Sequence, residues 1–339
     1  MTYSLKYTPD KVSMTGTLSL SLELELGWGR HDRPGDTKRV SKDREKETET
    51  LGWLLELCDR YSVPITFNVV GHLLLTECDG HHPGPYPHEW LQSDPGTDIG
   101  TNPRFYAPDM VRSIQTSDAD HELASHTYTH VEAGEVEDEV FQHELTVSRN
   151  THRGFGLPEP TTFTPPRHSV PPLSTLAQNG IKAVRINSPT YGNQPPGSPL
   201  SRFRWILTRK HPPREPEVEN GVVKIYSQPY LSLSATHLPQ GRKPEHPVFR
   251  SIPVRIRQNL HARSLVTSLK DTVEEKSHLH LWSHLHDISN WKQRYGIKTL
   301  IKKAAEYREN DRLETRTMRS TAEKHLDTYP GQAGVETSV

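Results

Sequence analysis

The clearest pattern of apolar and polar positions lies at residues 17–26, which read TLSLSLELEL. Leucines occupy every second position from Leu18 to Leu26, and threonine, serine or glutamate fills the positions between them. Strict alternation is typical of a β-strand, because successive side chains of a strand point to opposite faces. Two settings fit the pattern: a half-exposed strand of an antiparallel sheet, or an inner barrel strand whose leucines pack against helices.

A helix and a second strand are expected next. Residues 41–62 have the amphipathic pattern of a helix that ends before Pro64, and the apolar run 64–74 is typical of a buried strand. Further strands are expected at 121–125, 161–164, 181–187, 222–230 and 278–284, and further helices at roughly 136–152, 172–179, 254–275 and 297–309. Alternating strands and helices indicate a parallel α/β architecture, either a barrel or a doubly wound sheet.

One domain accounts for most of the 339 residues. We expect a single catalytic domain over 1–326 with long loops, because no internal repeat is apparent and α/β barrels of this size are common. Residues 327–339 are expected to form a flexible tail. The segment 78–108 is rich in proline, glycine, histidine and aspartate without a regular period, which predicts a long loop that helps to shape a binding cleft.

Composition narrows the classes of partner and the compartment. The formal net charge is -1, so the chain lacks the basic field that nucleic-acid binding usually requires. No apolar run approaches the length of a membrane span, and the first 16 residues lack the apolar core of a signal peptide. The only cysteines are Cys58, in an apolar run, and Cys78, which is no disulfide framework. We therefore expect a cytoplasmic protein without an integral membrane segment or a nucleic-acid partner.

Two pairs of residues suggest a metal-dependent site. Glu23 and Glu25 share one face of the first strand, about 6.6 Å apart along the backbone, a separation that suits one metal ligand beside one base. His126 and His130 are four residues apart, a spacing that can bring two imidazoles to one side of a helical turn. With 20 histidines in the chain, such spacing also arises by chance.

Three further groups could carry chemistry or be structural. Arg167 follows two prolines at the end of a predicted strand, where a guanidinium could hold a carboxylate ionised or simply lie in a surface loop. His284 ends an apolar strand and could donate a proton or be a core histidine. The loop residues Cys78, His81 and His82 form a rival metal site, although the loop offers its ligands no obvious rigid scaffold.

Taken in order, these motifs resemble those of the polysaccharide deacetylase (NodB-homology) family, the fourth carbohydrate esterase family. The segment HELASHTYTH resembles the family's His-Ser/Thr-x-x-His motif at His126 and His130, and SLELELGWG resembles its paired acidic motif. The resemblance runs from about Leu18 to His286 and implies a distorted (β/α) barrel of about seven strands. It also implies a metal-dependent hydrolase that removes N-acetyl groups from amino sugars.

The resemblance implies a role for each matching residue. Glu25, His126 and His130 would bind one divalent metal, expected to be zinc, with a position left open for the reaction. Glu23 would act as the catalytic base, Arg167 would hold it ionised, and His284 would act as general acid.

The sequence departs from the family pattern at three points. Glu23 stands where the family has aspartate, which predicts lower activity because the longer side chain displaces the base. Trp282 replaces a leucine before the fifth-motif histidine, and no aspartate-tryptophan motif lies between Ile181 and Tyr230. Three alternatives follow: a catalytically impaired carbohydrate-binding relative, a hydrolase of another amide or an O-acetyl ester, and an interaction protein without metal.

Overall fold

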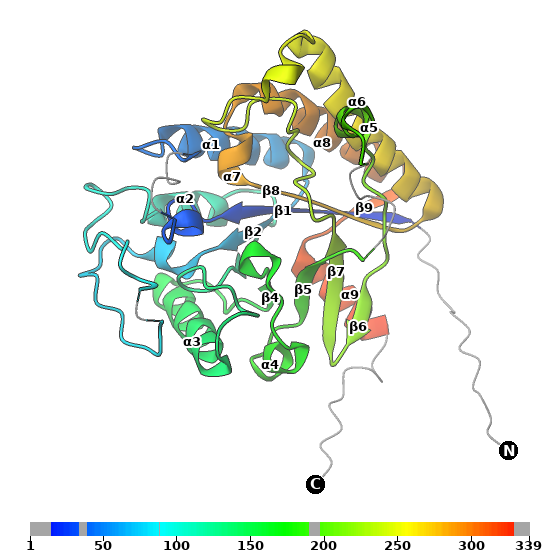
Figure 1. Cartoon of the computed structure of the whole chain (residues 1–339). Coiled ribbons are helices and arrows are strands. Elements are labelled where there is room, and N and C mark those ends of the chain that lie inside the picture. Colours follow the sequence, from blue (N-terminus) through cyan, green and yellow to red (C-terminus); the bar gives the residue numbers. More distant parts are fainter. Residues whose placement is uncertain (1–14, 34–38, 88, 190–196, 329–339) are drawn as a thin grey trace, which may run out of the picture.

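The computed structural model describes residues 15–33, 39–87, 89–189 and 197–328 (Figure 1). Seven parallel strands close into a barrel, and the predicted distorted (β/α) barrel is confirmed. These strands are β1 (Gly16–Leu24), β2 (Thr66–Val69), β3 (Glu122–Ser125), β4 (Thr162–Phe163), β5 (Ala183–Asn187), β7 (Val222–Ser227) and β8 (His278–His284). Strand β1 closes the barrel because it pairs with β2 on one side and with β8 on the other.

Two short strands and an outer ring of helices complete the fold. Strand β9 (Leu313–Thr315) pairs with the start of β1, and β6 (Glu217–Glu219) pairs antiparallel with β7. The helices are α1 (Glu45–Tyr61), α2 (Pro108–Gln115), α3 (Asp138–Phe155), α4 (Leu173–Gln178), α5 (Pro199–Thr208), α6 (Val254–Glu275), α7 (Leu285–Ile288), α8 (Arg294–Glu309) and α9 (Met318–Thr328). Figure 1 shows α1, α6 and α8 on one side of the barrel and α3 and α4 on the opposite side.

Strand β1 lies at the centre of the core. Its leucines belong to one apolar cluster with residues of α1, α6 and α8, such as Leu54, Leu269 and Leu300. Its polar face points into the barrel, where the hydroxyls of Ser19 and Ser21 each bond a histidine of β8 at 2.8 Å. The half-exposed antiparallel setting is therefore wrong, and the inner barrel strand is the setting that the fold adopts.

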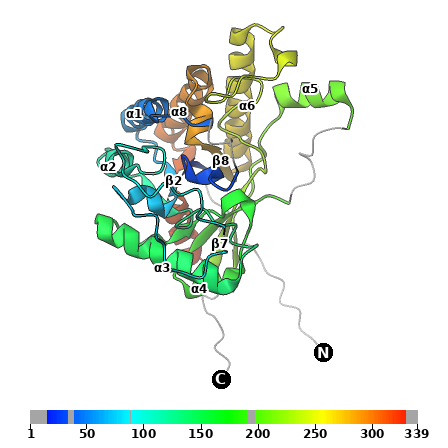
Figure 2. The ribbon, with the colours of Figure 1, turned by 60° about the vertical axis from the view of Figure 1, so that its left-hand side comes forward.

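Most predicted elements appear with shifted ends. The apolar run 64–74 is divided, because β2 ends at Val69 and a 3-10 helix, η3 (Gly71–Leu74), follows. Helices α2 and α5 were not predicted from the pattern. Both begin with proline, which is typical of loops but also fits the first turn of a helix, where its missing N–H is not needed. Figure 2 shows α5 at the edge of the molecule beside α6.

Helix α9 extends to Thr328, and the rest of the expected tail lies outside the described residues. Within the described part of the chain, every helix is too short or too polar to cross a membrane.

Candidate functional site

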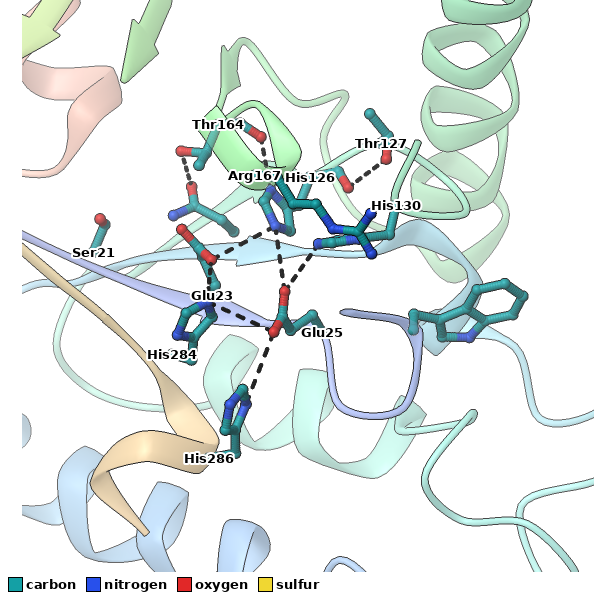
Figure 3. A network of polar contacts seen from close by, with 12 residues as sticks. Ser21, Glu23, Glu25, His126, Thr127, His130, Thr164, Arg167, His284 and His286 are labelled. Atoms are coloured by element: carbon teal, nitrogen blue, oxygen red, sulfur yellow. Dashed lines mark hydrogen bonds and ion pairs between the residues drawn. The ribbon is translucent and has the colours of Figure 1, made fainter. Parts of the chain in front are cut away.

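Polar side chains from three strand ends meet at the carboxyl end of the barrel (Figure 3). Glu23 lies in β1 and Glu25 follows it, while His126 and His130 follow β3 and His284 ends β8. The register places Glu23 beside His284. Because parallel strands bring their carboxyl ends to one rim of the barrel, residues far apart in sequence share one site there.

Glu25, His126 and His130 form a compact buried cluster. Their nearest ligand atoms all lie within 4.8 Å of one another. The Glu25 carboxylate is 2.9 Å from His130 Nε2 and 3.8 Å from His126 Nε2. Two imidazoles and a carboxylate are the donors of typical catalytic zinc sites.

The hydrogen bonds and the burial of the two histidines suit metal binding. Nδ1 of His126 donates to the carbonyl oxygen of Thr164 at 2.7 Å, so Nε2 is the nitrogen that faces Glu25. That buried Nε2 has no hydrogen-bond partner. Burial lowers the pKa of His130 to about 4, although Glu25 opposes the shift, so this imidazole is neutral near pH 7. The residues present therefore fit a divalent metal.

The loop from His126 to His130 is not the expected helical turn. Thr127 and His130 have positive φ angles of 60° and 68°, so two residues of the motif have a left-handed backbone that a helical turn does not contain. The buried carboxylate of Glu144, on α3, accepts the backbone N–H groups of Tyr128 and Thr129 at 2.7 and 2.8 Å. These bonds hold the two histidines at their separation, and a left-handed backbone costs roughly 1–3 kcal/mol that such contacts must offset.

Glu23 is paired with an arginine that the sequence analysis did not select. The Glu23 carboxylate forms an ion pair with Arg185, in β5, which is 1% exposed. The Arg185 guanidinium also donates to Ser21 at 3.3 Å and lies 4.4 Å from the centre of the Trp282 ring. A cation over a desolvated indole is stabilised by roughly 2 kcal/mol. Trp282, noted above as a departure from the family pattern, thus supports the arginine that faces Glu23.

Arg167 is not brought into contact with Glu23. Its guanidinium donates to the carboxylates of Asp32 and Glu132, on the side of the site where His126 and His130 lie (Figure 3). The predicted contact between Arg167 and Glu23 is therefore absent.

One signal in the sequence could have identified Arg185. It is the only charged residue of the strand AVRIN, and a lone charge in a buried strand needs a partner.

His284 lies between Glu23 and a third carboxylate. Its Nε2 is 2.9 Å from Glu23, and its Nδ1 is 2.7 Å from Asp287, at the start of α7. Burial disfavours a charged imidazole, but Glu25, Glu23 and Asp287 outweigh it and raise the pKa of His284 well above its usual value. The side chain is 22% exposed, more than those of Glu23 and Glu25, so this proton donor lies nearest to solvent.

The two glutamates are held ionised. Burial would raise the pKa of each carboxyl group, but facing cations reverse the direction. Arg185, and then His284, hold the pKa of Glu23 well below its usual range. His284 and the two histidines after β3 do the same for Glu25. The site thus contains an ionised carboxylate beside a protonated imidazole, which are the forms that base and acid catalysis require.

The chain resembles known proteins in sequence motif and in fold. The polysaccharide deacetylase family model matches residues 43–184, and the predicted family resemblance is confirmed. No curated protein gives a significant match.

Three solved structures share the fold over nearly the whole chain. A protein from Mycobacterium smegmatis that is assigned as a polysaccharide deacetylase is 16% identical, with a TM-score of 0.58 over 96% of this chain and 94% of its own. One from Pseudomonas aeruginosa PAO1 with the same assignment is 12% identical, with a TM-score of 0.57 over 93% and 92%. The allantoinase PuuE is 11% identical, with a TM-score of 0.55 over 93% and 91%. At these identities the likeness shows the fold.

Proposed function

We propose, on the premise that this chain is a member of the polysaccharide deacetylase family over residues 43–184, that it is a metal-dependent hydrolase of N-acetylated amino sugars. The single observation that carries the proposal is the position of Glu23. This ionised, buried carboxylate lies next to the Glu25, His126 and His130 cluster and within hydrogen-bond distance of His284. A base, an acid and a metal-binding cluster are thus within reach of one small reacting group.

Glu23 acts as the base in this proposal. Its carboxylate accepts a proton from the water molecule that attacks the acetamide carbonyl carbon. Arg185 holds the carboxylate ionised and fixes its position, so it is a positioning residue. Arg185 takes the part that the sequence resemblance gave to Arg167.

His284 acts as the general acid. After the tetrahedral intermediate forms, Nε2 donates its proton to the amine nitrogen as the carbon–nitrogen bond breaks. The Asp287 carboxylate accepts a hydrogen bond from Nδ1–H and keeps the ring oriented toward Glu23. The products are acetate and an amino sugar with a free amine.

Glu25, His126 and His130 would hold the divalent metal, which we propose to be zinc because two imidazoles and a carboxylate favour it. The metal would lower the pKa of water and polarise the substrate carbonyl. Location in the cytoplasm stays a prediction from the sequence.

The test measures metal content and acetate release together. We expect wild-type protein to release acetate from N-acetylglucosamine oligomers, and Glu23→Gln to keep its metal but lose the activity. His126→Ala should lose one metal equivalent relative to wild type and also the activity. Glu56→Gln, an exposed position on α1, is the matched control and should behave as wild type. Full activity in Glu23→Gln would remove the proposed base.

A second candidate is a hydrolase of a different carbon–nitrogen amide. The likeness to an allantoinase shows that this barrel also occurs in such an enzyme, and it favours testing a cyclic amide. Metal-dependent turnover of allantoin without acetate release would favour this candidate. Binding of acetylated oligosaccharides without any turnover would instead favour a catalytically impaired carbohydrate-binding relative. The glutamate at position 23, in place of the family's aspartate, is the reason to consider this alternative.

A further inference from the structure

We propose that His72, Cys78, His82 and Asp94 form a second, structural zinc site, separate from the catalytic cluster. Their nearest ligand atoms lie within 4.8 Å of one another. The site fastens the long segment 75–107 to the rim of the barrel. It shares no ligand with Glu25, His126 and His130.

The donor atoms are already close to tetrahedral spacing. In a tetrahedral zinc site, neighbouring nitrogen, oxygen and sulfur donors lie roughly 3.3–3.6 Å apart. Asp94 Oδ2 is 3.4 Å from the sulfur of Cys78, 3.8 Å from Nε2 of His72 and 2.5 Å from Nε2 of His82. Shifts of about 1 Å would bring all four donors onto one ion.

Three of the four ligand side chains are buried, and Cys78 is partly buried. The side chains of His72 and Asp94 are 0% and 1% exposed, and that of His82 is 8% exposed. Nε2 of His72 has no hydrogen-bond partner, although it is buried, lies 3.8 Å from Asp94 Oδ2 and is close to the other donors of the cluster. An unpaired buried nitrogen is costly unless something binds it, which indicates a missing ligand at this position.

Groups around the cluster orient the ligands. Nδ1 of His72 contacts the carbonyl oxygen of Phe105 at 3.4 Å, which leaves Nε2 as the metal-binding atom. Oδ1 of Asp94 accepts the N–H of Gly96 at 3.1 Å, which leaves Oδ2 as the oxygen that faces His72, Cys78 and His82. The hydroxyl of Tyr106 is 3.1 Å from the sulfur of Cys78 and can donate to a thiolate. Such outer contacts accompany most metal ligands in proteins.

The donor set determines the metal and the role. One thiolate, two imidazoles and one carboxylate favour zinc over calcium or magnesium, which prefer oxygen ligands. Four protein ligands leave no open position, as in structural rather than catalytic zinc sites. His72 comes from η3, directly after β2, and supplies the rigid scaffold that the loop sequence lacked. His81, the other candidate of the sequence pattern, is exposed and its N–H bonds Asp79.

The fastened segment reaches the catalytic site. It is drawn in cyan at the left of Figure 1 and carries Trp90, whose indole N–H donates to Thr129 at 3.0 Å. Trp90 also packs against His31, with 4.8 Å between the ring centres. Thr129 lies in the loop between the histidines at 126 and 130. A metal that holds the segment 75–107 in place therefore also holds Trp90 against the loop that carries His126 and His130.

Cobalt substitution tests the proposal independently of catalysis, because the catalytic cluster contains no sulfur. Metal-free protein would be titrated with Co²⁺ and followed for the charge-transfer absorption of cobalt bound to thiolate. We expect two bound Co²⁺ and the band in wild type, and one Co²⁺ with the band retained in His126→Ala. Cys78→Ser should lose the band and one equivalent. Cys58→Ser, the matched control at the other cysteine, is buried in α1 and should keep both.

Three results would overturn the proposal. The first is a wild-type protein that is saturated with Co²⁺ but lacks the charge-transfer band. The second is a band that persists in Cys78→Ser. The third is a band that is lost only in Cys58→Ser. In each case the four residues form a hydrogen-bonded cluster without metal. A wild-type protein that shows the band but releases no acetate would refute the deacetylase function and leave this site intact.

Discussion

At the scale of single residues, charge pairing determines the chemistry of the site. Glu23 is 5% exposed, and a carboxylate buried to this degree is normally protonated near neutral pH. Arg185 and His284 face it and reverse that tendency. The proposed base therefore depends on a cation that β5 supplies from outside the proposed metal-binding cluster.

This pairing predicts a shift in the pH dependence of activity. Arg185→Gln removes the nearest positive charge while burial remains, so the pKa of Glu23 rises and the acid limb of kcat/KM moves to higher pH. With the base pKa raised by one unit or more, activity below that pKa falls about tenfold per unit. Rate profiles between pH 4 and 9 would measure the shift.

Arg167→Gln is the matched control for that prediction, because Arg167 contacts Asp32 and Glu132 and not Glu23. The acid limb of Arg167→Gln should stay at the wild-type position. In Arg185→Lys, which keeps a positive charge, the limb should lie close to its wild-type position. A lower rate in Arg185→Gln without movement of the limb would indicate a purely structural arginine. If the acid limb moves only in Arg167→Gln, then Arg167, and not Arg185, is the residue that holds Glu23 ionised.

At the scale of elements, short turns after the strands place the ligands. The 3-10 helix η1 (Trp28–Arg30) follows β1 and passes directly beside the Glu25 side chain. A Cβ atom on Gly29 would lie 2.6 Å from Oε2 of Glu25, which is closer than any ordinary contact. A side chain at position 29 is thus incompatible with the present position of the metal-binding carboxylate.

Gly29→Ala is therefore expected to displace Glu25 and weaken metal binding by roughly 10–100-fold, the size of effect that misplaced metal ligands produce. Competition with a chelator of known affinity would measure the change. Gly52→Ala, on the exposed face of α1 with no atom within 4 Å of the added carbon, is the control. It should bind metal normally and gain up to about 1 kcal/mol of stability. Equal affinities in both variants would contradict the assigned role of Glu25.

At the scale of the whole molecule, the two proposed sites connect segments that are distant in sequence. The catalytic cluster joins the end of β1 to the loop after β3, and the second site joins η3 to the segment 75–107. Since the unfolded chain does not bring these ligands together, bound metal favours the folded state.

Metal removal should therefore lower the free energy of unfolding. A site held at 1,000 times its Kd contributes about 4 kcal/mol, and two sites contribute about twice that. Thermal or denaturant unfolding with and without a chelator would measure the difference, and added zinc should reverse it. Cys78→Ser and His126→Ala should each lose about half of the effect. A free energy of unfolding that is the same with and without the chelator would contradict both metal sites.

Much of the architecture follows from the sequence because local patterns carry it. Alternation at 17–26 identifies β1 and shows that its leucines share one buried face, and the residue types at Glu25, His126 and His130 are those of a zinc site. The alternation and the helix patterns depend on neighbours within a few positions. The order of strands and helices therefore indicates a parallel α/β architecture, and the family resemblance, not the pattern, singled out the barrel.

Contacts across the barrel were decided only by the tertiary structure. Arg185 and Glu23 are 162 residues apart, and closure of the barrel brings β5 opposite β1. Likewise, Asp94 and His72 join Cys78 and His82 because the segment 75–107 folds back on η3, which no spacing in the sequence encodes. The pattern of a chain specifies which face of an element is buried. Which charges meet inside depends on how all the elements pack together.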